Sequence, residues 1–199
     1  YDEIFIDKAF NMVNLAMHLM DIVQNSISAG AKRIEMELIE ISANNCLQFS
    51  VIDDGCGMSS KTIARLTDPF FTSRTTRKVG LGIPFLKMTS EQTDGYLEIK
   101  SEIGKRTIVK AVYKTNHPDC IPLGDLGGYM MVILAANPII HFSFSYRLDD
   151  NIFEIDTNTL ANEGIDDLSN GEIALAIKEY INENLKILFE KRDKNSFLN

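Results

Sequence analysis

Two polar side chains one helical turn apart could hold a metal ion. Asp21 and Asn25 lie four residues apart in a stretch whose apolar residues recur at steps of three and four, so both project from one face of a predicted helix. The amide oxygen of Asn25 is a ligand of the kind that a hard cation such as Mg²⁺ accepts. Alternatively, the two side chains bond each other or a neighbouring backbone group, because a buried carboxylate or amide without a partner costs stability.

A second acid follows a short apolar run in the sequence VIDDGCGM, residues 51–58. A carboxylate at the end of a strand, such as that of Asp53, can accept a hydrogen bond from an exocyclic amine such as that of adenine. Gly55 and Gly57 would let a flat ring approach the backbone. Taken alone, the stretch is explained more simply as a tight turn, since Gly and Asp are common turn residues.

Cations gather in a third stretch, DPFFTSRTTRKVGLG, at residues 68–82. Arg74, Arg77 and Lys78 lie within five residues and are followed by Gly80-Leu81-Gly82 and a predicted helix. Free N–H groups at the start of a helix bind phosphate, and nearby cations reinforce that binding. A dinucleotide-binding fingerprint would need a strand directly before the glycines, where the residues are polar, and a Walker-type loop is also absent. The three stretches in this order indicate a nucleotide site of another design.

Apolar periodicity and turn residues divide the chain into elements that would position these groups. Helices are predicted over residues 8–29, 59–66, 83–90 and 126–136. A last helix is predicted to open at Ser169 to Glu172, which has the pattern of a capping box with Ser169 as the cap. Strands are predicted over residues 33–39, 47–52, 96–101, 107–113, 139–148 and 152–156. Asp21 and Asn25 therefore fall on the first helix, and Asp53 follows the second strand. A polar stretch at 115–119 predicts a boundary, which divides the chain into residues 1–115 and 116–199.

Composition limits the classes of partner. The chain has 199 residues, is 45% hydrophobic and 24% charged, and contains no apolar run near the ~20 residues of a membrane span. Three scattered cysteines suggest free thiols in a reducing compartment, and we expect a cytoplasmic protein. Residues 1–115 hold 14 basic and 14 acidic side chains, whereas residues 116–199 hold 6 and 14, so the net charge of −8 lies in the second part. A nucleic-acid partner is therefore not expected there. The first residue is Tyr1 rather than Met, so we expect a fragment or a processed product.

The order of the stretches resembles that in the Bergerat-fold ATPases, the superfamily of gyrase, heat-shock chaperones, histidine kinases and mismatch-repair proteins. LMDIVQNSISAGAKRIEM is similar to their Asn-bearing first box, most of all that of the mismatch-repair members, and this likeness implies that Asn25 is the Mg²⁺ ligand. VIDDGCGM is similar to the next box, which implies that Asp53 contacts the adenine amine. Gly55, Gly57 and Met58 would then lie beside the ring.

Two further stretches extend the resemblance over about residues 10–114. DPFFTSRTTRKVGLGIPF resembles the histidine-kinase form of the mobile lid, which implies nucleotide contacts from a set of residues on the phosphate side: Phe70, Arg74, Arg77, Lys78, Gly80, Leu81 and Gly82. Gly104-Lys105-Arg106-Thr107 is similar to the closing glycine–threonine box, in which Thr107 would support the contact between Asp53 and adenine. The implied fold class is α+β: a two-layer α/β sandwich with a mixed, mainly antiparallel sheet, followed by a smaller C-terminal α+β region.

The resemblance leaves three functions open. The first is a Mg-ATP-binding domain of a sensor histidine-kinase-like signalling protein that transfers a phosphoryl group. The second is an ATPase whose lid closure drives a conformational or dimerisation switch, and the third is a nucleotide-sensing module without turnover. Hydrolytic members carry Glu four residues before the Asn, where this chain has Asp21, which could act as the base through a water or only hold Asn25. No His stands in a phospho-acceptor pattern, so we expect the acceptor on a partner protein or, if the chain is a fragment, before Tyr1. A homodimer is a further candidate assembly.

Overall fold

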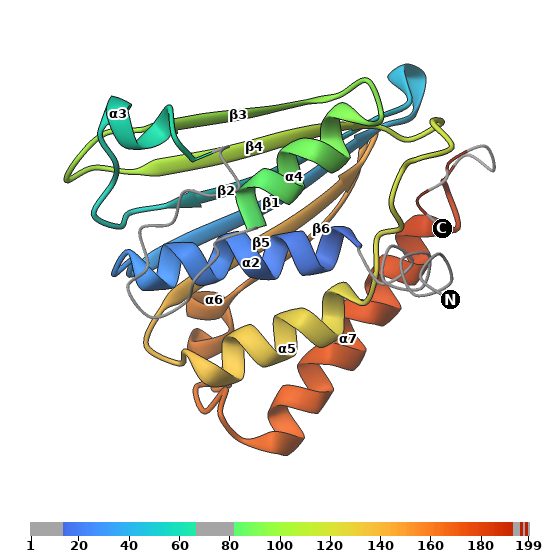
Figure 1. The fold of residues 1–199 in the computed structure, drawn as a ribbon. Helices are drawn as coiled ribbons and strands as arrows, with labels where there is room; N and C mark the ends of the chain where they lie inside the picture. The colour runs from blue at the N-terminus through green and yellow to red at the C-terminus, as the bar shows by residue number, and fades with distance from the viewer. Residues whose placement is uncertain (1–13, 67–81, 193–195, 197, 199) are drawn as a thin grey trace, which may run out of the picture.

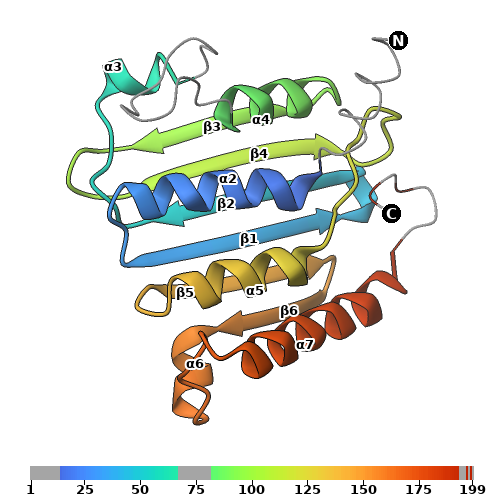
Figure 2. The ribbon, with the colours of Figure 1, turned by 60° about the horizontal axis from the view of Figure 1, so that its bottom comes forward.

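The strands form one sheet that is covered on one face by helices. The computed structural model describes residues 14–66, 82–192, 196 and 198, and in these residues six strands form a sheet in the order β3-β4-β2-β1-β5-β6. Figure 2 shows α4, α2, α5 and α7 side by side on the same face of this sheet. This arrangement confirms the predicted α+β fold with two layers.

The strand pairing confirms a mixed, mainly antiparallel sheet. Every neighbouring pair is antiparallel except β1 and β5, which run parallel. The strands are β1 (Arg33–Ile41), β2 (Cys46–Asp53), β3 (Tyr96–Ser101), β4 (Thr107–Lys114), β5 (His141–Leu148) and β6 (Asn151–Asp156). The predicted fifth strand starts two residues later than expected, because Asn137 to Ile140 form a turn after α5 in which the Ile140 N–H bonds the Asn137 carbonyl.

The helices of the described residues, labelled in Figure 1, are α2 (Leu15–Ser28), α3 (Ser60–Ile63), α4 (Gly82–Glu91), α5 (Leu126–Ala136), α6 (Thr157–Asn162) and α7 (Gly171–Phe189). A 3₁₀ turn, η1, spans Ser42–Asn44. The side chain of Asn14 caps α2, and Gly30 follows the end of α2 with φ +76°, a conformation that favours glycine. The cap of α7 is Asn170 rather than the expected Ser169, whose hydroxyl instead donates to Asp167. The short helix α6 was not predicted, and residues 8–13 of the first predicted helix lie outside the described part of the chain.

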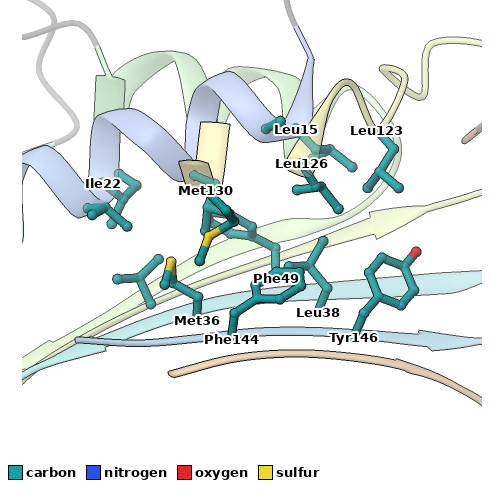
Figure 3. Close-up of a cluster of buried hydrophobic side chains, with 14 of the residues drawn as sticks. Leu15, Ile22, Met36, Leu38, Phe49, Leu123, Leu126, Met130, Phe144 and Tyr146 are labelled. Atoms are coloured by element: carbon teal, nitrogen blue, oxygen red, sulfur yellow. The ribbon is translucent and has the colours of Figure 1, made fainter. Parts of the chain in front are cut away.

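The core lies between the helices and the sheet. Alternate residues of β1 face the helices, and Met36 pairs with Val51 of β2 on one side and with Phe144 of β5 on the other. Figure 3 shows side chains of α2 and α5, among them Ile22 and Met130, above those of the sheet. The core therefore runs without a break from β2 across β1 to β5.

The C-terminal region shares this sheet and core. Near the end of β1, Glu40 is only 2% exposed and faces Arg192, which follows α7. The two side chains form an ion pair at 3.0 Å, and the hydroxyl of Tyr146 on β5 donates to the same Glu40 oxygen at 2.7 Å. Both sides of the predicted boundary between residues 115 and 116 contribute strands to this one sheet. That the two sides are separate folding units stays a prediction.

Candidate nucleotide-binding site

The C-terminal half of α2 meets the end of β2 through one short hydrogen bond. The hydroxyl of Ser26 donates to Asp53 Oδ2 at 2.7 Å, and both side chains are buried. The same hydroxyl lies 3.3 Å from the carbonyl oxygen of Ile22, but it has one hydrogen, and the shorter contact to a carboxylate is the stronger. Asn25, the neighbour of Ser26, is thereby placed on the helical turn that contacts the acid of VIDDGCGM.

The Asp53 carboxylate keeps capacity for another donor. Among the described residues, Oδ1 accepts the Gly55 N–H at 2.9 Å and Oδ2 accepts the Ser26 hydroxyl. A carboxylate has about four lone-pair sites, so each oxygen can accept a second hydrogen bond. Asp53 is 5% exposed and faces the helical layer, at the end of the sheet where α2 ends. An exocyclic amine is the kind of group that this arrangement can recognise.

Thr107 stands beside Asp53 on the neighbouring strand. The register of β2 and β4 pairs Asp53 with Thr107, and Thr107 with Ser101 of β3. The hydroxyls of Ser101 and Thr107 lie 2.8 Å apart, and the Met58 N–H donates to Ser101 Oγ at 2.9 Å. The segment after β2 is thus tied to the β3–β4 hairpin, and the predicted residues Asp53, Met58 and Thr107 are brought together.

Gly55 and Gly57 are required by contacts within the protein itself. A Cβ on Gly55 would lie 2.8 Å from Asp53 Oδ1 and 2.9 Å from the Cβ of Ala29, and a Cβ on Gly57, where φ is +65°, would collide with the backbone carbonyl of Glu102. A real Cβ does not approach other atoms so closely, so the chain must shift to accept any side chain at either position. These glycines keep the turn packed on α2 and on the hairpin, and a role beside a bound ring stays a prediction.

Asp54 serves the fold rather than the site. Its Oδ1 accepts the backbone N–H groups of Lys32 at 2.7 Å and of Arg33 at 2.9 Å, at the start of β1. These backbone bonds, that of Arg33 above all, lower the pKa of the Asp54 carboxyl. Of the two adjacent acids, Asp53 therefore faces the candidate site and Asp54 joins the end of β2 to the start of β1.

Asp21 lies against the beginning of α4. A Cβ on Gly82, the first residue of α4, would lie 3.0 Å from the Asp21 Cβ and 3.3 Å from its Oδ2. Asn25 is half-buried one turn further along α2. The amide of Asn25 and the carboxylate of Asp21 thus occupy the α2 face nearest to the start of α4, where backbone N–H groups lack helical partners.

Several predicted phosphate-side residues cannot be placed. Phe70, Arg74, Arg77, Lys78, Gly80 and Leu81 lie outside the described residues. A hollow of about 380 Å³ lies between α5 and α7, next to Leu126 and Leu185 rather than next to Asp53. That hollow is lined mainly by apolar side chains and contains none of the predicted site residues, so the candidate site is the region around Asp53.

Ser26 was missed as a site residue by the sequence reasoning. Serine inside a helix usually bonds a carbonyl of its own helix, and nothing in the local sequence reveals a distant carboxylate. The available signal was its position four residues after Ile22, on the buried face of an otherwise apolar helix. A buried polar residue on such a face needs a partner, and the partner is Asp53.

The arrangement fits ATP and a magnesium ion. Asp53, with Thr107 beside it, is of the chemical type that accepts a hydrogen bond from an exocyclic amine, and an amide oxygen such as that of Asn25 is of the type that Mg²⁺ takes as a ligand; both contacts stay predictions. Free N–H groups at the start of α4, which begins at Gly82, would donate hydrogen bonds to phosphate oxygens. These groups come from β2, β4, α2 and α4: the Ser26–Asp53 bond joins α2 to β2, strand pairing joins β2 to β4, and α4 begins close to Asp21 of α2.

Relatives of the chain include proteins whose names describe them as a sensor protein or a sensor protein kinase. It is 32% identical over 103 residues to a Shewanella frigidimarina protein whose name describes it as a sensor protein, and 30% identical over 110 residues to the non-motile and phage-resistance protein of Caulobacter vibrioides. It is 35% identical over 66 residues to the sensor protein kinase FleS of Pseudomonas aeruginosa. These matches cover 51%, 51% and 33% of this chain but only 16%, 13% and 16% of the relatives, so the chain spans about a sixth of their length.

Other comparisons concern the fold and the family. A crystal structure of the N-terminal domain of a DNA repair protein has a TM-score of 0.48 and 15% identity to the chain, over 72% of this chain and 51% of the other. None of the described helices is both long enough and apolar enough to cross a membrane. The family of histidine kinase-, DNA gyrase B- and HSP90-like ATPases matches residues 13–116, more than half of the 199 residues. The chain therefore belongs to this family, whose ATPase domain is matched at residues 13–116.

Proposed function

We propose that the chain binds Mg-ATP at the junction of α2, β2, β4 and α4, as the ATP-binding part of a sensor histidine-kinase-like signalling protein. The observation that carries this proposal is the buried pair of Ser26 and Asp53, which holds a base-recognising carboxylate beside the turn of α2 that bears Asn25. The sensor relatives support the signalling role. Because the chain spans about a sixth of their length, the acceptor and the partner proteins belong to the proposal as well.

Each residue has a separate task in this proposal. Asp53 accepts a hydrogen bond from the adenine amine, and Thr107 supports that contact from β4. Asn25 holds the metal ion, which neutralises phosphate charge when it is bound. The start of α4 at Gly82 receives the phosphates, reinforced by Arg74, Arg77 or Lys78. Transfer of a phosphoryl group then depends mostly on positioning and electrostatic stabilisation.

Calorimetry with two variants tests the site. Asp53→Asn places an amide donor or a weaker acceptor where the adenine amine needs a carboxylate, and should weaken ATP by about thirtyfold or more, with and without Mg²⁺. Asn25→Ala should instead remove the gain in ATP affinity that Mg²⁺ gives, and should leave the metal-free affinity near that of the wild type. Asp54→Asn, a change in the adjacent acid that bonds only backbone of β1 among the described residues, is the matched control. Wild-type affinities in both site variants would rule out this site.

Turnover is a second candidate activity, favoured by the approach of Asp21 to Gly82. If Asp21 takes a proton from an attacking water, steady phosphate release should fall in Asp21→Asn while Mg-ATP affinity stays within a few-fold. Incubation with γ-labelled ATP, alone and with cell lysate, separates the outcomes. Label on another protein supports kinase activity, and free phosphate without labelled protein supports an ATPase switch. Bound ATP without any label transfer supports nucleotide sensing.

A further inference from the structure

Three buried polar side chains meet between α2, α4 and β4, away from the candidate nucleotide site. His18 Nε2 of α2 lies 3.2 Å from the Thr89 hydroxyl of α4, and that hydroxyl lies 3.0 Å from the hydroxyl of Tyr113 on β4. His18 is 3% exposed, Thr89 2% and Tyr113 0%. In an otherwise apolar core, such a cluster costs stability unless every member has a hydrogen-bond partner.

One assignment of the hydrogen atoms satisfies all three side chains. A threonine hydroxyl has one hydrogen and two lone pairs, and Thr89 Oγ1 lies 3.0 Å from the carbonyl oxygen of Phe85 and 3.3 Å from that of Leu86, either of which can accept that hydrogen. With the Nε2–H tautomer of His18, the threonine lone pairs then accept from His18 and from the O–H of Tyr113. Burial lowers the pKa of His18 to about 4 and raises that of Tyr113 well above its usual value. Near pH 7 the ring is therefore neutral, the phenol keeps its proton, and Thr89 fills all three of its bonding capacities.

Each of the three elements also carries a residue of the candidate site. His18 is seven residues before Asn25 on α2 and Thr89 is seven residues after Gly82 on α4, which corresponds to about 10 Å along each helix. Tyr113 is six residues after Thr107 on β4. Because β4 is hydrogen-bonded to β2 and β3, it is the fixed part of this group. Figure 2 shows α2 and α4 as neighbours over the sheet, and α4 is the helix that begins against Asp21.

We propose that His18, Thr89 and Tyr113 are positioning residues that fix α4 relative to α2 and β4, and thereby set the phosphate end of the nucleotide site. This inference rests on the proposed ATP-binding function. A helix that turns by about 10° around Thr89 moves its first residue by nearly 2 Å, which is enough to lose a hydrogen bond. The adenine end does not depend on α4, because Asp53, Ser26 and Thr107 belong to α2 and the sheet.

Substitution of Thr89 separates the two ends of the site. Thr89→Val keeps the shape of the side chain but removes the hydroxyl that pairs with His18 and Tyr113. The affinity for Mg-ATP should fall by about tenfold or more, while the affinity for adenosine should change less than twofold. Thr89→Ser keeps the hydroxyl and should restore the ratio of the two affinities. The control is Ser90→Ala, since Ser90 is fully buried in α4 and bonds the Lys87 carbonyl of its own helix rather than α2 or β4 among the described contacts. Both affinities are measured by NMR titration, which follows weak ligands.

The outcomes distinguish a positioning role from a merely structural one. A fall in the melting temperature of Thr89→Val with unchanged affinities, or an equal loss for ATP and adenosine, would overturn the inference. A lower ATP-to-adenosine affinity ratio in the control Ser90→Ala would also overturn it. If Thr89→Val does not fold, Tyr113→Phe removes one donor without changing the shape of the ring and should lower the ATP-to-adenosine ratio in the same direction. Failure of the wild type to bind ATP would instead refute the proposed function.

Discussion

The hydrogen bond between Ser26 and Asp53 should contribute more to the free energy of unfolding than any other side-chain contact of the candidate site. Ser26→Ala removes a buried hydroxyl that donates to a carboxylate at 2.7 Å. Hydrogen bonds to charged groups contribute about 1.5–3 kcal/mol, and Ala in place of Ser returns about 0.5 kcal/mol of helix propensity. The expected net loss in the free energy of unfolding is therefore about 1–2.5 kcal/mol. The matched control is Ser90→Ala, which removes a fully buried helical serine that bonds only the Lys87 carbonyl of its own helix among the described contacts.

Urea unfolding measures both variants. The Ser90→Ala loss should be about 0–1 kcal/mol, because a neutral bond of about 0.5–1.5 kcal/mol is offset by the same gain in helix propensity. Both transitions should keep the wild-type m-value, so that the midpoints report stability alone. In calorimetry, Ser26→Ala should weaken ATP and adenosine by the same factor, since the change lies at the adenine end. Equal destabilisation by Ser26→Ala and Ser90→Ala would refute the reasoning that the bond to Asp53 stabilises more than a local one.

Three further changes test other parts of the structure. Burial lowers the pKa of His18 from the usual 6.5 to about 4, so the unfolded chain takes up a proton at a higher pH than the folded protein. Lowering the pH should therefore reduce the free energy of unfolding by up to about 3 kcal/mol through His18. The contribution of the neutral ring is complete above pH 6.5 and is lost as the pH falls towards 4. His18→Gln should flatten that part of a plot of urea midpoint against pH, and an unchanged slope would assign it to other groups. Gly57→Ala should lower the free energy of unfolding by about 3 kcal/mol or more, because the new Cβ would collide with the Glu102 carbonyl. Gly104→Ala is the control: its φ is +73° and no atom lies within 4 Å of the new Cβ, so only backbone strain of about 1 kcal/mol is expected. Equal shifts in the melting temperatures of the two glycine variants would contradict this steric argument. A chain that ends at residue 115 should lose cooperative unfolding, since β1 would lose its parallel neighbour β5; a transition at the wild-type midpoint would show two independent folding units.

Local patterns predicted most elements of the fold but not their long-range pairing. Alternation identified Ile34, Met36 and Leu38 as one face of a strand, and the structure buries all three. The same alternation gives no indication that β1 pairs with β5, more than a hundred residues later, because periodicity carries no information about the neighbouring strand. Glu40 continues the buried face of β1, and its partner Arg192 lies 152 residues away, so the sequence offered no local reason for a charge at that place.

The candidate site shows a similar division. Residue types and spacing were sufficient to single out Asn25 and Asp53, because metal ligands and base acceptors are limited to a few side chains. They could not reveal Ser26, whose partner is 27 residues away, or the reason why Gly57 must be a glycine, which is the carbonyl of Glu102 on the hairpin. Both facts are contacts between elements. The nucleotide-contact roles of these residues remain predictions for the binding experiments to decide.

The family match and the sheet end at different places in the chain. The match ends at residue 116, just after β4, whereas the sheet continues from β1 into β5 and β6. The later residues also act on the start of α2, because the carbonyl groups of Pro122 and Leu123 accept the N–H groups of Leu15 and Ala16 at 3.0 Å. These N–H groups belong to the first turn of the helix that carries Asn25 and would otherwise need water or a capping side chain. The segment that follows the ATPase domain therefore stabilises the helix on which the proposed metal ligand stands, so a change there can reach the site through α2 without touching a nucleotide.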